Sequence, residues 1–145
     1  MTDWSGGVQA QHSESAQVEA VIRASIGWAE DKDLELLYNS LVQDESLFIF
    51  HPNDGDTISG FDAFRRMAET VFMSPAFKAT GFEIRDLRIG FSRSGTVACC
   101  SARLDDRGEW DGRPIGWESA RWTGVLEKRE GSRRIAQMHF SLPAD

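Results

Sequence analysis

The sequence predicts a single α+β domain, with three N-terminal helices packed on a strongly curved antiparallel sheet. Three observations predict this fold class. Apolar residues recur at helical spacing in the first half of the chain, they alternate as in strands through most of the second half, and the chain closes with a long hairpin. Runs of helices followed by runs of strands are typical of α+β domains, in which helices cover one face of an antiparallel sheet.

Length and composition narrow the class of protein. The chain has 145 residues, which suits one domain. Its formal net charge of −7 disfavours nucleic acids and anionic membranes as partners, because both need a basic surface. The two cysteines, Cys99 and Cys100, are adjacent in a strand-like run and so point to opposite faces. The sequence shows no metal-ligand spacing, cofactor motif, membrane-length apolar run or signal peptide, so it predicts a cytoplasmic protein without metal or cofactor.

The N-terminal part divides into an arm and the start of the domain. Residues 1–12 are polar and contain Gly6-Gly7, which predicts a flexible arm, and residues 13–145 are assigned to the domain. Ser13 and Ser15 are suitable helix N-caps, and the apolar pattern after them predicts a helix to about Glu30. The apolar positions of this helix are Val18, Val21, Ile22, Ile26 and Ala29.

Two more helices and one short strand are predicted before the long strands of the sheet. Asp31 or Asp33 caps a second helix, which has apolar or aromatic residues at helical spacing. A short strand follows at residues 47–50, and residues 51–56 have the composition of a turn. A third helical pattern covers residues 59–74 and ends at a proline.

The remainder of the chain has the pattern of strands. In residues 82–91 the parity of the apolar positions reverses near Asp86, which predicts a β-bulge and a bend in the sheet. Residues 96–104 form a mostly apolar run that suits a central strand. Residues 105–116, which contain three Gly and one Pro, are either a loop or a pair of strand ends. A bent sheet wrapped around helices leaves a hollow on its concave side.

The C-terminal hairpin spans residues 117–141, with its tip at residues 129–131. A three-residue loop closed by a left-handed glycine places Lys128 opposite Ser132. In this register one apolar face pairs Trp122 with Met138, Gly124 with Ala136, and Ala120 with Phe140. The other face pairs Arg121, Thr123 and Val125 with His139, Gln137 and Ile135.

This order of elements resembles the nuclear transport factor 2-like superfamily, and more narrowly its SnoaL-like branch, which is also similar to the association domain of calcium/calmodulin-dependent kinases. The matching residues are Arg121-x-Thr123-x-Val125, Lys128-x-x-Gly131, Ile135 and His139-x-Ser141, with support from Asp31 to Leu37, Ser59-Gly60-x-Asp62 and the third helix. The resemblance covers residues 18–141 approximately and implies a cone-shaped, barrel-like fold. The family usually has a Trp before the final strand and a His-x-His-x-Ser motif, where this chain has Arg133 and Gln137.

The resemblance implies a ligand site in the hollow between the sheet and the helices. The candidate lining residues are Trp28, Tyr38, Phe72, Trp122, Met138 and Phe140. The alternative for any one of them is a purely structural place in the core. For the group a pocket is favoured, because so many large side chains rarely close completely on themselves in a small domain.

Polar residues offer two further clusters. His51, Asp54 and Tyr38 are candidate catalytic residues, since His51 and Asp54 follow the first strand near the expected mouth of the hollow, and a His beside a carboxylate can move protons. The alternative is a turn without chemistry. The second polar cluster comprises Arg121, Gln137 and His139, which lie either at an interface between copies or, in a different register, in the pocket.

Two functions follow from the resemblance, because the superfamily includes ketosteroid isomerase-like enzymes, polyketide cyclases, dehydratases and non-catalytic domains. One is acid–base chemistry on a small apolar carbonyl compound. The other is a non-catalytic module that binds a small ligand or only forms oligomers. The inward positions of the last two strands carry no acid, which argues against the isomerase reaction. Exposure of Val125 and Ile135 on the convex face predicts a homodimer through sheet faces.

Overall fold

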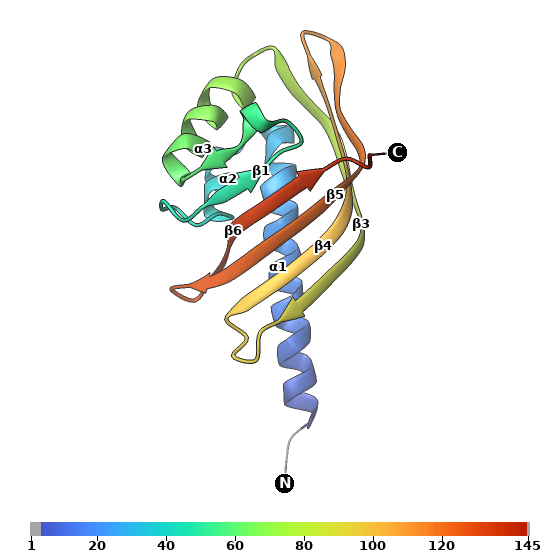
Figure 1. Ribbon diagram of the computed structural model, residues 1–145. Helices are drawn as coiled ribbons and strands as arrows, with labels where there is room; N and C mark the ends of the chain where they lie inside the picture. The colour runs from blue at the N-terminus through green and yellow to red at the C-terminus, as the bar shows by residue number, and fades with distance from the viewer. Residues whose placement is uncertain (1–3, 145) are drawn as a thin grey trace.

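The computed structural model describes the backbone of residues 4–144 and the side chains of residues 13–144. It has an α+β fold in which helices pack against a curved six-stranded sheet that does not close into a barrel (Figure 1). The helices are α1 (Trp4–Asp31), α2 (Leu34–Asn39) and α3 (Phe61–Met67), with a 3-10 turn at Asp54–Asp56 and a π-helical turn at Ala68–Phe72. The strands are β1 (Phe48–Phe50), β2 (Ile58–Ser59), β3 (Phe77–Phe91), β4 (Val97–Trp110), β5 (Arg113–Arg129) and β6 (Ser132–Ser141).

The strand order is β2-β1-β6-β5-β4-β3, and every neighbouring pair is antiparallel except β1 and β6. The prediction of a wholly antiparallel sheet was therefore wrong at this one pairing. The cause is the chain that leaves α2, which already lies along β6. Leu41 forms a parallel bridge with Ile135, and the Ile135 amide donates to the Ser40 carbonyl at 2.8 Å. The chain continues in that direction into β1.

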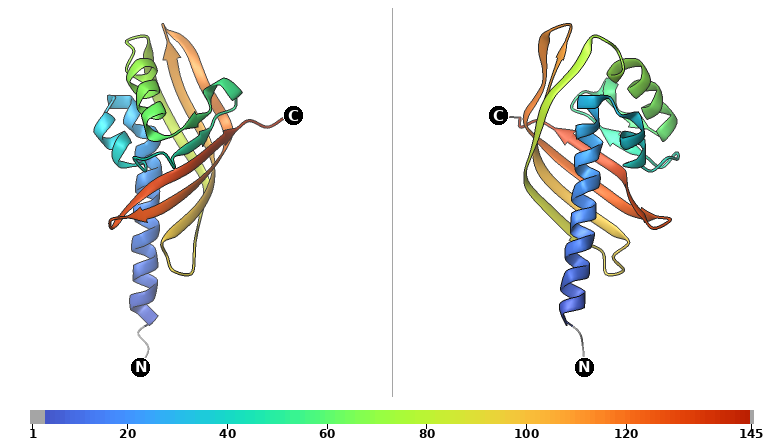
Figure 2. Two further views of the ribbon diagram at one scale, coloured as in Figure 1. Left: turned by 60° about the vertical axis from the view of Figure 1, so that its left-hand side comes forward. Right: turned by 180° about the vertical axis from the view of Figure 1, so that it is seen from behind.

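Helix α1 crosses the concave face of the sheet, and its N-terminal end extends beyond it (Figure 2). The helix begins at Trp4, inside the segment predicted to be an arm, and residues 1–3 lie outside the described part of the chain. The division into an arm and a domain stays a prediction. Of the two predicted caps for the second helix, Asp33 is confirmed, because its carboxylate accepts from the Leu36 amide at 3.1 Å.

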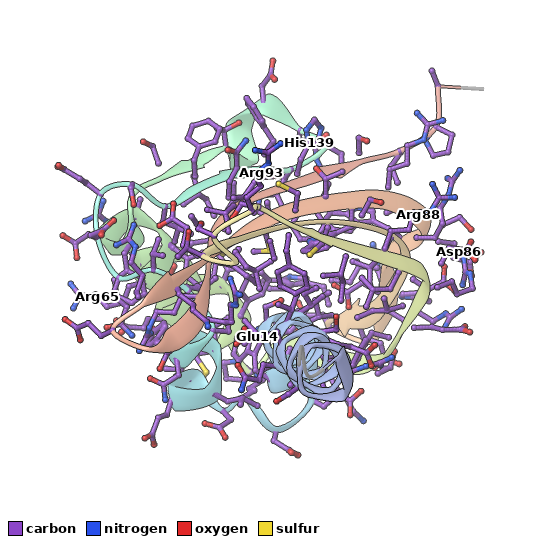
Figure 3. All side chains as sticks on the ribbon, turned by 90° about the horizontal axis from the view of Figure 1, so that it is seen from below. Glu14, Arg65, Asp86, Arg88, Arg93 and His139 are labelled. Atoms are coloured by element: carbon purple, nitrogen blue, oxygen red, sulfur yellow. The ribbon has the colours of Figure 1, made fainter. Side chains whose placement is uncertain are left out.

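An ion-pair cluster attaches α1 to the β5–β6 hairpin. Arg133 is buried and donates to Glu14 at 3.0 Å. It also donates to the Thr96 carbonyl at 3.1 Å and lies over the Phe91 ring. Lys128 binds the other carboxylate oxygen of Glu14 at 2.8 Å. Glu14, labelled on α1 in Figure 3, is thus the helix residue that the hairpin holds.

The register of the C-terminal hairpin differs from the prediction in two ways. The loop has two residues, Glu130 and Gly131, whose φ angles of 52° and 83° are typical of a tight type I′ turn, so Arg129 faces Ser132. A second irregularity lies between the pairs formed by Val125 and Leu126. Beyond it Trp122 pairs with Phe140 and Gly124 with Met138, in place of Trp122 with Met138 and Gly124 with Ala136.

The inner face of the hairpin nevertheless holds the predicted apolar residues. The two register errors add to a shift of two, which preserves the side-chain parity, so Trp122, Met138 and Phe140 face the core. Ile135 is the exception. It was predicted beside Val125 on the convex face, but it is fully buried, because the irregularity after it reverses the alternation along β6.

Several register shifts interrupt the pairing of the long strands. The predicted bulge near Asp86 is confirmed, with a register shift between Arg85 and Arg88 and a φ of 56° at Asp86. A second shift lies in β5, where Ser119 has a φ of 53°. Of the two alternatives for residues 105–116, the pair of strand ends is correct: β4 and β5 continue to a tight turn at Asp111-Gly112.

Candidate active site

The start of β3, the end of β4 and the start of β5 come together at the top of the sheet in Figure 1. The residues of these strand ends line a cleft of about 470 Å³. The residues that line it include Thr80, Asp106, Gly108, Ile115, Trp117 and Glu118. Most of the cleft is therefore formed by residues 105–116, for which the sequence predicts either a loop or a pair of strand ends.

No helix among the described residues is long and apolar enough to cross a membrane.

Asp106 places a carboxyl group on the inner face of the sheet beside this cleft. It continues the inward alternation of β4, whose buried members are Ala98, Cys100 and Leu104. Its register partners are Phe82 on β3, which packs against Gly27 of α1, and Trp117 on β5. Burial raises the pKa of Asp106 from 3.8 to about 6. A carboxyl group with this pKa can exchange a proton near neutral pH.

Aromatic rings extend from Asp106 towards β1. The Trp117 ring lies 5.4 Å from that of Phe140 and 6.2 Å from that of His51, measured between centroids. His51 stacks on Phe140 with their planes 4° apart and their centroids 5.2 Å apart. Phe140 is buried, while His51 and Trp117 are partly exposed. The result is a flat apolar wall with an imidazole on one side and a carboxyl group on the other.

The 3-10 turn determines which nitrogen of His51 is available. Nδ1 of His51 lies 2.8 Å from the carbonyl oxygen of Asp56. A carbonyl oxygen can only accept, so Nδ1 carries the proton in the neutral ring, and Nε2 is the acceptor. The carbonyl partner thus prepares Nε2 to accept a proton or a hydrogen bond.

Gly116 permits the close approach of β5 to β4 at the cleft. Its φ is 120°, which L side chains rarely adopt. A Cβ atom at this position would overlap the carbonyl oxygen of Asp106 and would lie 3.1 Å from the Cα of Arg107. Gly116 therefore sets the backbone position of Asp106.

Among the described side chains, no hydrogen bond joins the three predicted catalytic residues to one another. Only His51 lies beside the aromatic wall. Asp54 is exposed at the start of the 3-10 turn, and the oxygen that His51 contacts belongs to Asp56. Tyr38 lies on α2, where its hydroxyl donates to Glu69 at 3.3 Å, and burial together with Glu69 raises its pKa.

The six predicted lining residues are distributed over several parts of the interior. Trp28 and Phe72 contact each other edge to face at 5.8 Å, and Tyr38 contacts Phe61 in the same way. Trp122 and Met138 are buried in the core, and Phe140 is the one that joins the aromatic wall beside the cleft. Their role in ligand binding stays a prediction.

The second polar cluster lies on the convex face. Arg121, Gln137 and His139 are all exposed there, and Figure 3 shows His139 on the side of the sheet away from α1. The His139 ring lies 5.5 Å from that of Phe50, which is 42% exposed. Within residues 13–144, no group of three or more His, Cys, Asp or Glu side chains is arranged to hold a metal ion.

Sequence reasoning missed Asp106, and for Trp117 it favoured a place on the surface over one at the rim of the hollow. The signal for Asp106 was present in the alternation of β4, because it is two residues beyond the apolar Leu104. The predicted strand ended at residue 104, and the absence of an inward acid was inferred from the last two strands alone. Trp117 had no comparable signal, because its face depends on the bulge at Ser119.

Comparison with known proteins agrees with this architecture. A family model described as a SnoaL-like domain matches residues 18–145. A search of curated proteins gives no match.

Solved structures of several proteins are similar in fold. A candidate scytalone dehydratase from Novosphingobium aromaticivorans is 14% identical, with a TM-score of 0.76 over 92% of this chain and 86% of the other. A candidate dehydratase of the nuclear transport factor 2-like family from Streptomyces avermitilis is 16% identical, with a TM-score of 0.74 over 92% and 99% of the two chains. The CamKII hub homology domain from Chlamydomonas reinhardtii is 22% identical, with a TM-score of 0.68 over 89% and 98%. At these identities the likeness concerns the fold.

Proposed function

The chain belongs to the SnoaL-like domain family, and on that basis we propose that it binds a small apolar carbonyl compound at the cleft beside Asp106 and performs acid–base chemistry on it. Isomerisation, cyclisation and dehydration are the reaction types that this chemistry serves. The observation that supports the proposal most is the partly buried carboxyl group of Asp106, whose pKa of about 6 allows it to take up or release a proton near neutral pH.

The surroundings of Asp106 suit such a substrate. Trp117 and Phe140 offer flat apolar surfaces to a ring or acyl chain. In the neutral His51 ring Nε2 is the acceptor, because Nδ1 donates to the Asp56 carbonyl. In the proposed reaction the ionised Asp106 carboxyl group takes a proton from the carbon beside the carbonyl group and returns it to the substrate or to the leaving oxygen, while Nε2 of His51 accepts a hydrogen bond from a substrate hydroxyl group. The three residues Asp106, Trp117 and His51 form the proposed site.

The replacement Asp106→Asn tests the acid–base role. We expect it to abolish turnover of small apolar carbonyl compounds while leaving the fold intact, because the amide keeps the shape and loses the exchangeable proton. Glu118→Gln is the matched control, since Glu118 lines the same cleft but its side chain is 81% exposed. If a substrate is found and both variants turn it over as the wild type does, Asp106 is not the acid–base group.

The pH dependence of stability gives an independent check on Asp106. The folded state holds this proton more tightly than the unfolded chain, for which the pKa is 3.8. The stability that it contributes is therefore fully present below pH 3.8 and is lost as the pH rises through about 6. Asp106→Asn should be more stable than the wild type at pH 7.5, by up to about 3 kcal/mol, and no more stable at pH 3.5. Denaturant titrations at the two pH values measure this, and a difference that does not change with pH would contradict the raised pKa.

A second candidate function is homo-oligomerisation without catalysis, similar to a kinase association domain. It is supported by the outer-face aromatic patch, which consists of Phe48, Phe50 and His139 and leaves Phe50 42% exposed. The likeness in fold to a CamKII hub homology domain supports it as well. Because Ile135 is buried, the apolar part of this convex face comes from Phe50, Phe48 and the partly buried Val125.

The replacement Phe50→Asp tests the assembly. A homodimer through the convex face buries Phe50, so a charge there should convert the dimer to a monomer without lowering the melting temperature of the monomer. Sedimentation velocity at micromolar concentration measures the change. Leu36→Asp is the control, since Leu36 is equally exposed at 43% but lies on α2. If the wild-type protein sediments as a monomer, the proposed homo-oligomerisation is wrong.

A further inference from the structure

Two adjacent acids of β4 point to opposite faces of the sheet. Asp106 faces inwards beside the cleft, and Asp105 faces the convex side, where it is nevertheless only 5% exposed. Hydrogen bonds from Arg85 and from the Ser119 amide hold the pKa of its carboxyl group at about 2, far below the pKa of Asp106. Asp105 is therefore permanently ionised at neutral pH and cannot share a proton with the site.

Asp105 is the centre of a network that connects three strands. Arg85 of β3 binds both of its carboxylate oxygens, with the second contact at 3.1 Å, and Arg107 binds it at 3.2 Å. The backbone amide of Ser119 on β5 donates to it at 2.7 Å. Arg85 also donates to the Ser119 hydroxyl at 2.9 Å. Ser119 is thus held through both its amide and its side chain.

Ser119 is the residue at which β5 bulges. Its φ of 53° is unfavourable for a residue with a side chain, so it persists only where neighbouring contacts hold it. Opposite it, Leu104 pairs with Ala120 and Asp106 with Trp117, so that Glu118 and Ser119 together face the single residue Asp105. Asp105 is the residue that fills the gap in the ladder and bonds to the bulged amide.

The bulge decides which side chain stands next to Asp106. Ala120 faces inwards, so regular alternation would turn Glu118 inwards and Trp117 outwards. The extra residue reverses this order, and Trp117 reaches the aromatic wall while Glu118 is exposed. Without the bulge, a glutamate would lie beside the Asp106 carboxyl group in place of an indole.

We propose that Asp105 is a positioning residue for the Asp106 site: through Arg85 and Ser119 it holds the β5 bulge that turns Trp117 towards Asp106 and Glu118 away from it. This inference rests on the proposed function, because it assigns Asp105 a role in a site that Asp106 defines. In this role Asp105, which lies on the convex face, makes no contact with the ligand. It acts through the backbone of β5.

The test is the pKa of the Asp106 carboxyl group, measured by ¹³C NMR titration in the wild type and in Asp105→Asn. In the wild type we expect a pKa of about 6. In Asp105→Asn the charge that holds Arg85 is lost, Trp117 leaves the inner face, water reaches the carboxyl group, and the pKa falls towards 3.8. The emission of Trp117, compared with a Trp117→Phe reference, should move to longer wavelength in the same variant.

Two further variants make the result specific to the bulge. Glu83→Gln is the matched control: Glu83 also contacts Arg85, at 3.5 Å, but does not reach Ser119, so it should leave the Asp106 pKa unchanged. Adding Ser119→Gly to Asp105→Asn should restore a raised pKa, because glycine adopts a positive φ without strain. If the pKa of Asp106 fell only because the charge of Asp105 was lost, Ser119→Gly would not restore it.

The outcomes separate this inference from the proposed function. A wild-type pKa near 3.8 for Asp106 would remove the proposed function itself. A raised wild-type pKa that stays the same in folded Asp105→Asn would overturn the positioning role and leave the proposed function in place. If Asp105→Asn does not fold, the same comparison in Arg85→Met decides, since methionine has no donor for Asp105 or Ser119. An unchanged Asp106 pKa in that variant overturns the inference too.

Discussion

Replacing Trp122 with alanine is expected to lower the free energy of unfolding by about 3–5 kcal/mol. Trp122 lies in mid-strand on β5, is 1% exposed and is the largest of the fully buried side chains. Its ring covers Gly124, where a Cβ atom would lie 2.6 Å from the indole. Removing the ring leaves a cavity that rigid strands on both sides cannot fill. Equilibrium unfolding in urea, monitored by circular dichroism, measures the loss.

Trp122→Phe separates packing from the polar group of the indole. Trp122 Nε1 is buried without a hydrogen-bond partner among the described residues, and phenylalanine removes this unpaired group together with part of the ring. We expect a smaller cost than for alanine, about 1–2 kcal/mol. The smaller ring also makes room at Gly124, so Gly124→Ala should cost less in Trp122→Phe than in the wild type. Additive costs in this double-mutant cycle would show that the two residues do not share the space.

The same variants examine the predicted ligand role of Trp122. If small apolar carbonyl compounds raise the melting temperature of the wild type and of Trp122→Phe by equal amounts, Trp122 has a structural role only. If Trp122→Phe loses that response while its stability is largely retained, a ligand reaches the ring. Trp117→Phe provides the comparison at the cleft, where Trp117 is partly exposed and the ligand response should weaken.

The sequence was sufficient to predict the α+β class and the inner face of the hairpin, because both depend on periodicity. The predicted and the observed registers differ by two residues, so Trp122, Met138 and Phe140 face inwards in both. Turn length and bulges depend on one or two residues and on contacts with other strands, so Ile135 was placed on the wrong face. The parallel pairing of β1 with β6 joins segments almost ninety residues apart, for which the sequence contains no local signal.

The candidate site was less predictable than the fold for the same physical reason. His51 was identified from a local motif, a His in a turn after a strand. To predict Asp106, the strand would have to be continued beyond Leu104 through the polar pair Asp105-Asp106. To predict the direction of Trp117, the bulge at Ser119 would have to be known, and hydrogen bonds with Asp105 and Arg85 on two other strands hold this bulge. Long-range hydrogen bonds therefore decide which side chains reach the cleft.

Replacing Gly116 with alanine is expected to be about as damaging as the loss of Trp122, although it adds a single methyl group. The new Cβ would overlap the carbonyl oxygen of Asp106 and lie 3.0 Å from its carbonyl carbon. These are backbone atoms of a paired strand and cannot rotate away. The overlap costs about 1–3 kcal/mol, and a φ of 120° adds about 1–3 kcal/mol for a residue with a side chain. The two together amount to several kcal/mol in the free energy of unfolding.

Gly112→Ala separates the two contributions. Gly112 lies in the turn of the same β4–β5 hairpin with a φ of 81°, and a Cβ atom there would meet nothing within 4 Å. It should therefore show the cost of the backbone conformation alone, about 1–3 kcal/mol. The difference between the variants is the cost of separating β5 from β4 at the cleft. Because that separation exposes Asp106 to water, Gly116→Ala should also lower its pKa, and Gly112→Ala should not. Equal destabilisation by the two replacements would mean that β4 and β5 are not in close contact at Gly116.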